Sequence, residues 1–93
     1  MLRIADPFVS ASPNQVSGVL NGETVLLSST TNLYYGLDPV GSRIWELIQE
    51  PKRISTISTQ LASEFDVDPI LCERDTRELI LKLVEADLVK LED

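Results

Sequence analysis

The fold is decided by the stretch Leu33-Tyr34-Tyr35-Gly36-Leu37-Asp38-Pro39-Val40-Gly41-Ser42-Arg43-Ile44-Trp45-Glu46-Leu47-Ile48, within which the hydrophobic period changes from two residues to 3.6. Before the change, Leu33, Tyr35 and Leu37 alternate with Asn32, Tyr34 and Gly36, which predicts a strand over residues 32–37 with one buried face. After it, Asp38 is a good helix cap and Pro39 suits the first helical position. We therefore expect the strand to run directly into a helix over residues 39–49, whose apolar stripe is Val40, Ile44, Trp45 and Ile48.

Upstream of this stretch, the sequence predicts a β-hairpin. Asn21-Gly22 separates two strand-like runs, residues 15–20 and 23–28, and both of these residue types accept the positive φ of a two-residue type I′ turn. Together with residues 32–37, the hairpin forms a three-stranded antiparallel sheet, which is too small to be stable alone in water. Residues 1–14 contain only the short apolar group Phe8-Val9, and we expect an irregular arm or a brief edge strand there.

Downstream, two further helices are expected. Ser55 is a candidate cap for the second, in which Ile57, Leu61 and Phe65 recur at a helical spacing, and Asp68-Pro69 starts a third helix that runs to about Ala86. Residues 1–93 then form one α+β domain, in which a three-stranded antiparallel sheet is followed by three helices in the layout of a winged helix-turn-helix.

The composition removes most kinds of active site. The chain has 93 residues, no histidine and a single cysteine, Cys72, so no Cys-His pair, Ser-His-Asp triad or His/Cys zinc cluster is available. The acidic residues follow no calcium-loop pattern and alternate with basic residues, as on a solvated helix face. We expect a binding module without a metal, a cofactor or catalysis of its own.

Charge and hydropathy narrow the choice of partner. The formal net charge is −7, which counts against nucleic acid, because phosphate binding depends on clustered Lys and Arg. The chain has no signal-peptide pattern, no run of membrane-spanning length and no cysteine pair, so we expect a cytoplasmic protein with no membrane partner.

Two places in the sequence are candidate parts of a binding surface. Tyr34 and Tyr35 must point to opposite faces of their strand, so one of them is either a contact for a ligand or an ordinary surface tyrosine. On the third helix, a core-facing stripe borders a second stripe that mixes apolar and charged residues. The second stripe is either a groove wall or the margin of the buried face; the core stripe is Thr76, Ile80, Leu83 and Val84, and its neighbour is Cys72, Asp75, Leu79 and Lys82.

Three patterns in this order resemble the PqqD-like family, the small proteins that hold precursor peptides. They are the aromatic strand followed by Leu37-Asp38 and the Val40-Gly41-x-x-Ile44-Trp45-x-Leu47 helix, then Ile54-Ser55-Thr56-Ile57 with Leu61 and Phe65, and finally Asp75 with Leu79, Ile80, Leu83, Leu88 and Val89. The resemblance covers about residues 15–91. It departs at Ala86-Asp87, where the family usually has glycine in the turn after the last helix.

The resemblance implies a recognition element for ribosomally made, modified peptides, most like the free-standing leader-binding proteins of lasso-peptide pathways. Such a protein works with a separate transglutaminase-like cysteine protease and an ATP-dependent cyclase. The leader adds as an antiparallel strand and lays side chains against the third helix. The leader-binding residues that it implies are Asn32, Leu33, Tyr34, Tyr35, Gly36 and Leu37 on the strand, and Cys72, Asp75, Thr76 and Leu79 on the helix.

A winged-helix transcriptional regulator is the alternative, because this fold class often binds DNA. Charge on the third helix counts against it. Acidic side chains at Glu73, Asp75, Glu78 and Glu85 offset Arg74, Arg77 and Lys82, which leaves no basic face for phosphates.

Overall fold

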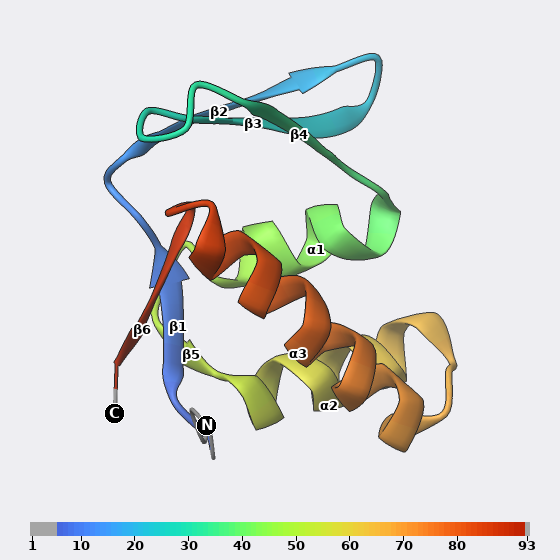
Figure 1. Ribbon diagram of the computed structural model, residues 1–93. Coiled ribbons are helices and arrows are strands. Elements are labelled where there is room, and N and C mark those ends of the chain that lie inside the picture. The colour runs from blue at the N-terminus through green and yellow to red at the C-terminus, as the bar shows by residue number, and fades with distance from the viewer. Residues whose placement is uncertain (1–5, 93) are drawn as a thin grey trace.

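Two small antiparallel sheets pack against three helices in the computed structural model of the chain, which describes residues 6–92 (Figure 1). The elements in chain order are β1 (Phe8–Ala11), β2 (Gln15–Leu20), β3 (Glu23–Ser28), β4 (Tyr34–Leu37), α1 (Pro39–Leu47), β5 (Lys52–Arg53), α2 (Ile54–Phe65), α3 (Pro69–Glu85) and β6 (Val89–Glu92). The expected α+β class and the three helices are confirmed.

The first sheet has the strand order β2-β3-β4 and lies over α1 (Figure 1). Asn21 and Gly22 form its hairpin turn with φ values of 53° and 82°, as a type I′ turn requires. Strand β4 begins at Tyr34, two residues later than predicted, because Asn32 is left-handed (φ 60°) and still belongs to the preceding loop. Leu33 is therefore exposed, and its predicted place on the buried face is wrong.

The second sheet, with the order β5-β1-β6, was not foreseen. Strand β1 is its central strand, pairing with β5 on one side and β6 on the other, and Val9 is fully buried. The predicted irregular arm or edge strand is therefore wrong for residues 8–11, whose partners lie more than 40 residues away and leave no local pattern. Residues 1–5 of that arm lie outside the described residues.

Helix starts follow the predicted caps at two of the three helices. The Asp38 carboxylate accepts from the Gly41 amide (2.7 Å), and the Asp68 carboxylate accepts from the amides of Ile70 (2.8 Å) and Leu71 (3.2 Å). The prediction that Ser55 caps α2 is wrong. Ser55 lies inside the helix, and its amide and hydroxyl donate to the carboxylate of Asp6, at 2.9 and 2.8 Å. A residue 49 positions earlier thus satisfies the first turn of α2.

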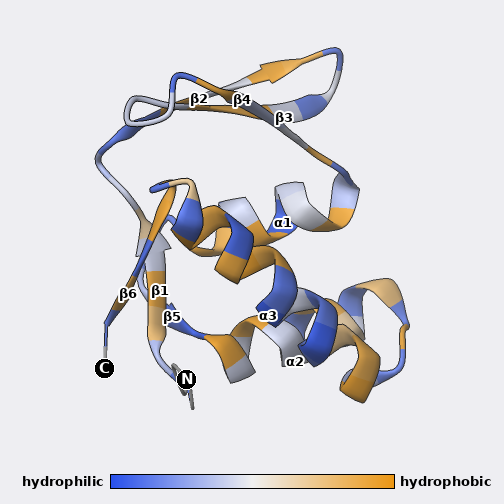
Figure 2. Cartoon of the chain, in the orientation of Figure 1, coloured by the Kyte–Doolittle hydropathy of each residue, from blue (hydrophilic) through white to orange (hydrophobic). Residues whose placement is uncertain are grey.

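The core lies where the three helices meet the two sheets, and Figure 2 shows orange, apolar segments on all three helices. Trp45 is buried there, as expected for a side chain at the junction of α1 and the sheet. The largest fully buried apolar side chains of the core come from every layer: Val9, Leu26, Ile44, Ile48, Ile54, Ile57, Leu61, Ile80 and Leu88. No helix in residues 6–92 has the length and apolar character needed to cross a membrane.

Candidate functional site

Strand β4 has a free edge, since no strand within residues 6–92 pairs with its outer side. In an antiparallel pair of strands, every second pair of opposed residues is joined by backbone hydrogen bonds. The Ser28 amide donates to the Leu33 carbonyl (3.1 Å), and in this register Leu26 and Tyr35 form the next hydrogen-bonded pair. The backbone groups of Tyr35 and Leu37 therefore face β3, while those of Tyr34 and Gly36 face outward. This edge offers two successive sets of backbone donors and acceptors to another strand.

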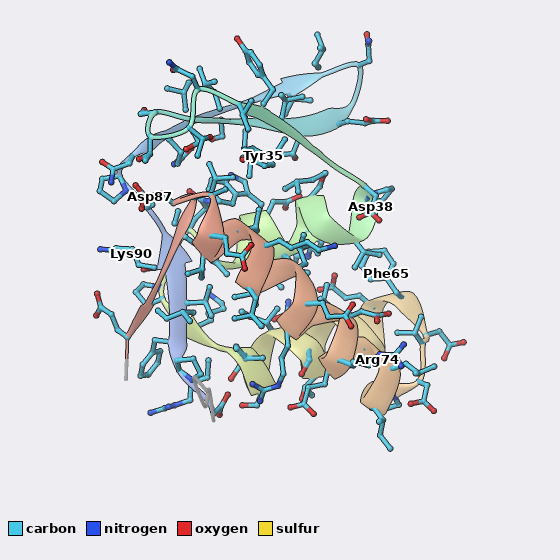
Figure 3. The ribbon with its side chains drawn as sticks, viewed as in Figure 1. Tyr35, Asp38, Phe65, Arg74, Asp87 and Lys90 are labelled. Carbon is cyan, nitrogen blue, oxygen red and sulfur yellow. The ribbon has the colours of Figure 1, made fainter. Side chains whose placement is uncertain are left out.

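Side chains of β4 alternate as predicted. Tyr34 is 74% exposed on the outer face of the sheet, whereas Tyr35 is half-buried against the core (Figure 3). The Tyr35 hydroxyl lies 3.5 Å from the hydroxyl of Thr31. The two tyrosines thus occupy opposite faces, and Tyr34 is the exposed one.

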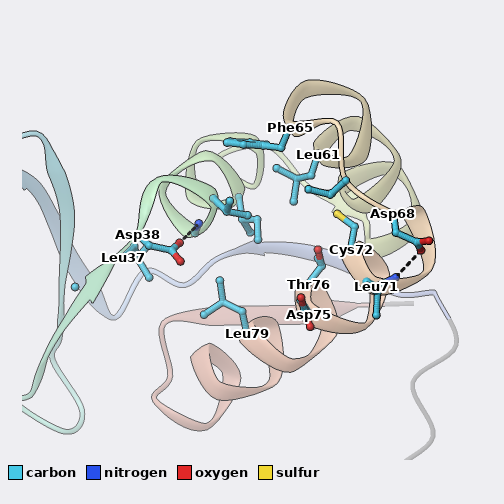
Figure 4. A pocket seen from close by; sticks show the side chains of 15 residues that line it. Leu37, Asp38, Leu61, Phe65, Asp68, Leu71, Cys72, Asp75, Thr76 and Leu79 are labelled. Carbon is cyan, nitrogen blue, oxygen red and sulfur yellow. Dashed lines mark hydrogen bonds between the residues drawn. The ribbon is translucent and has the colours of Figure 1, made fainter.

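A pocket of about 590 Å³ opens where β4 runs into α1. Its walls come from the end of β4, the first turns of α1, the end of α2, the loop after it and the first half of α3 (Figure 4). Apolar side chains dominate these walls: Leu37, Val40, Leu61, Phe65, Leu71 and Leu79. Several of them remain partly exposed, so the pocket is an apolar surface open to solvent.

Gly41 allows the three elements at the pocket's inner end to approach closely. A Cβ at this position would lie 3.2 Å from Asp38 Oδ1, 3.3 Å from Leu37 Cβ and 3.4 Å from Leu79 Cδ2. A larger side chain would therefore push β4 away from α3 or fill the pocket.

The structure brings together six of the ten predicted site residues. Gly36 and Leu37 on β4 and Cys72, Asp75, Thr76 and Leu79 on α3 all line the pocket. Tyr34 and Tyr35 belong to the same strand, β4, but do not line the pocket. Asn32 and Leu33 lie in the loop before β4. The predicted residues thus form one continuous feature, which is a strand edge that leads into a pocket.

The walls contributed by α1 and α2 were missed. Val40, Leu61 and Phe65 were expected to be core residues, because each falls on a helical apolar stripe. That expectation is confirmed for Leu61, which is fully buried and also lines the pocket. Phe65 and Val67 are 37% and 46% exposed in a stretch that is otherwise acidic, Phe65-Asp66-Val67-Asp68. The sequence signal for this pocket wall was that two apolar residues alternate with aspartates directly before the start of a helix.

Cys72 and Thr76 form the floor on the α3 side, and both are buried. The Cys72 thiol lies 3.5 Å from the Ser58 carbonyl on α2, so it packs between helices while lining the pocket. The part of the chain that the structure describes contains no group of three His, Cys, Asp or Glu residues arranged to hold a metal ion. What this arrangement offers chemically is backbone pairing and apolar contact.

An ion pair holds the α1 and α2 walls together. Arg43 donates to both carboxylate oxygens of Glu64, at 2.9 and 3.0 Å. The two hydrogen bonds from Arg43, together with one from Gln60, lower the pKa of Glu64 to about 2. Arg43 and Glu64 are the chain neighbours of Ile44 and Phe65, so this pair links α1 to α2 beside two pocket walls.

Comparisons with known proteins found one matching family and two similar solved structures. The family model described as coenzyme PQQ synthesis protein D (PqqD) matches residues 23–89. A solved structure of TbiB1 in complex with the TbiA(beta) leader peptide is 40% identical, with a TM-score of 0.78, over 87% of this chain and 94% of that chain.

A second solved structure, lasso peptide synthetase B1 complexed with the leader peptide, also has a TM-score of 0.78. It is 21% identical over 88% of this chain and 96% of that chain, and so supports the fold alone. None of the curated proteins compared with the chain matches it. The family model spans most of the sequence and the 40% identical structure covers nearly all of it, and we conclude that the chain belongs to the PqqD family.

Proposed function

We propose that this protein binds the leader segment of a ribosomally made precursor peptide and presents it to separate processing enzymes in lasso-peptide biosynthesis. The similar TbiB1 and lasso peptide synthetase B1 structures each hold a leader peptide, and the chain shares their fold. In this proposal the three helices and the β2-β3 hairpin form a winged helix-turn-helix that binds a peptide and not DNA.

The observation that carries the proposal is that the free edge of β4 and the apolar pocket are continuous, since Gly36 and Leu37 belong to both. A leader strand pairs with the outward backbone groups of Tyr34 and Gly36. The segment that follows or precedes it then lays apolar side chains against Leu79 and Phe65. Main-chain pairing supplies affinity with little sequence demand, and the pocket supplies selection.

The free energy of binding is consistent with contributions from both strand pairing and the pocket. Ordering a flexible peptide costs about 1 to 2 kcal/mol per residue of backbone, which strand pairing at two residues of β4 does not offset. Burial of an apolar side chain contributes about 1.5 to 3 kcal/mol, so two or three anchors in the pocket make binding favourable. The pocket is therefore as necessary to the proposed function as the edge.

The enzymes we expect as partners are a transglutaminase-like cysteine protease and an ATP-dependent cyclase, all working in the cytoplasm. This protein contributes no reacting group to either step. Tethering the leader raises the local concentration of its cleavage site at a bound enzyme to about the mM range, which accelerates processing without any chemistry here.

The decisive variant is Tyr34→Pro, tested with a synthetic leader peptide of the precursor. Proline removes an outward amide of β4 and leaves the bonds of Tyr35 and Leu37 to β3 in place. We expect the Kd measured by fluorescence anisotropy to rise beyond about 100-fold, since both the amide and the approach of the strand are lost.

Ser17→Pro is the matched control. In the β2-β3 register, the amide of Ser17 faces the outer edge of β2, so this proline carries the same local cost at the opposite edge of the same sheet. It should leave the Kd within about twofold of the wild-type value. Equal losses in the two variants, with both still folded by circular dichroism, would reject β4 as the docking edge.

A further inference from the structure

The apolar pocket has carboxylates around its opening. Asp38 lies at the start of α1, Asp68 at the start of α3 and Asp75 on α3 between them, and all three line the pocket (Figure 4). Among the described residues that line it, none is Lys or Arg. An apolar surface whose charged lining residues are all acidic is selective for the charge of what enters it.

The helix starts do not cancel this charge. Each helix N-terminus carries about half a positive charge, whereas the aspartate that caps it carries a full negative charge. Asp38 and Asp68 each accept their capping bonds through Oδ1, and Oδ2 makes no hydrogen bond within residues 6–92. Both second oxygens are available to a ligand.

Asp75 has a partner that leaves it accessible. Arg74 Nη2 lies 3.5 Å from Asp75 Oδ1, and the two side chains are 64% and 66% exposed. Exposed pairs of this kind contribute little to stability, so an incoming cation competes readily for the carboxylate. The opening therefore keeps a net negative charge.

We infer that the peptide segment filling this pocket carries a Lys or Arg within one or two positions of its apolar anchor, and that Asp38, Asp68 and Asp75 select for it. The inference rests on the proposed function. A lysine or arginine stem lies well along apolar walls such as Val40 and Leu71 while its charged end reaches a carboxylate at the opening. An acidic residue in the same place would meet like charge without compensation.

General attraction between a chain of net charge −7 and any basic peptide is the competing explanation. Two triple variants separate local selection from this background, because each removes three negative charges. The pocket set is Asp38→Asn, Asp68→Asn and Asp75→Asn. Asparagine caps helices about as well as aspartate, so the helix starts are preserved. The distal set is Glu50→Gln, Glu85→Gln and Glu92→Gln, all exposed and none lining the pocket.

The probe is a displayed library of random peptides about 20 residues long, long enough to cover both the strand edge and the pocket. Selection on the wild-type protein and on the distal set should enrich peptides with Lys or Arg beside an apolar residue. Selection on the pocket set should lose that enrichment while still yielding apolar, strand-forming binders. One enriched peptide, resynthesised, should bind the pocket set about tenfold more weakly than the distal set at about 0.05 M salt, and nearly equally at about 1 M.

Enriched binders that lack an excess of Lys and Arg, or equal affinities for the two triple variants at low salt, would overturn the inference and leave strand addition intact. A library that yields no binder to the wild-type protein would overturn the proposed function together with it. Thermal denaturation of both triple variants verifies that each is folded before selection.

Discussion

Asp87 occupies the turn after the last helix, where the family resemblance leads us to expect glycine. It adopts a left-handed conformation (φ 58°), which glycine reaches without strain. Its carboxylate oxygen Oδ2 accepts from Asn14 Nδ2 (3.0 Å) and Thr30 Oγ1 (2.6 Å). The side chain therefore joins the turn after α3 to the loops that flank the β2-β3-β4 sheet (Figure 3).

This arrangement predicts an order of stability among variants of Asp87. Asp87→Ala keeps the backbone strain and loses both bonds, and should lower the free energy of unfolding by about 1 to 2 kcal/mol. Asp87→Gly loses the bonds but removes the strain, so the loss should be smaller, and Asp87→Asn should be nearly neutral. Urea denaturation gives the three values. An alanine variant as stable as the wild-type protein would show that the two bonds do not matter, and a glycine variant no more stable than the alanine variant would show that the strain does not matter.

At the scale of elements, the Arg43–Glu64 ion pair links α1 to α2 beside the pocket. The pKa of Glu64 is lowered from 4.5 in the reference state to about 2. A lowered carboxyl pKa contributes stability that is fully present above the unfolded value and is lost as the pH falls through the folded value. The contribution should therefore disappear between about pH 4.5 and pH 2.

Glu64→Gln tests this contribution, because glutamine has no charge to lose. The melting temperature of the wild-type protein should fall more steeply than that of the variant as the pH drops from 5 to about 2.5. Asp6 also has a lowered pKa, caused by the hydrogen bonds from Ser55, and contributes in the same direction in both proteins. The difference between the two curves isolates Glu64, and parallel curves would exclude the predicted role of the pair.

The elements that sequence reasoning predicted are those specified by neighbouring residues. The hairpin at Asn21-Gly22, the β4-α1 junction at Asp38-Pro39 and the start of α3 at Asp68-Pro69 are local signals, and all three are confirmed. The β5-β1-β6 sheet and the capping of α2 by Asp6 depend on contacts across more than 40 residues. The hydrophobic period of a single segment carries no information about contacts of this kind.

The candidate site divides in the same way. Its β4 and α3 parts came from the family resemblance, while the walls from Val40, Leu61 and Phe65 needed the packed structure. Apolar residues at helical spacing fit a core and a pocket wall equally well. The exposure that remains after folding identifies Val40 and Phe65 as pocket walls, whereas the fully buried Leu61 belongs to both the core and the pocket.

At the scale of the whole molecule, the helices and the β5-β1-β6 sheet form a body that holds the β2-β3-β4 sheet, and of the two outer edges of that sheet the β4 edge leads into the pocket. The pocket lies where that sheet meets the helical body, so both parts must be in place for a peptide to engage edge and pocket together (Figures 1 and 4). The central claim is that a leader peptide extends this sheet at β4.

Amide hydrogen exchange, measured by NMR with and without the leader peptide, tests that claim at individual atoms. The amides of Tyr34 and Gly36 face the free edge, so they should exchange slowly only in the complex, while those of Ser17 and Val19 on the opposite edge should exchange at the same rate in both states. Chemical shifts should also change along the pocket, at Leu37, Cys72 and Leu79. Protection confined to the β2 edge or to the outer face of α2, with Tyr34 and Gly36 unaffected in the complex, would contradict the account.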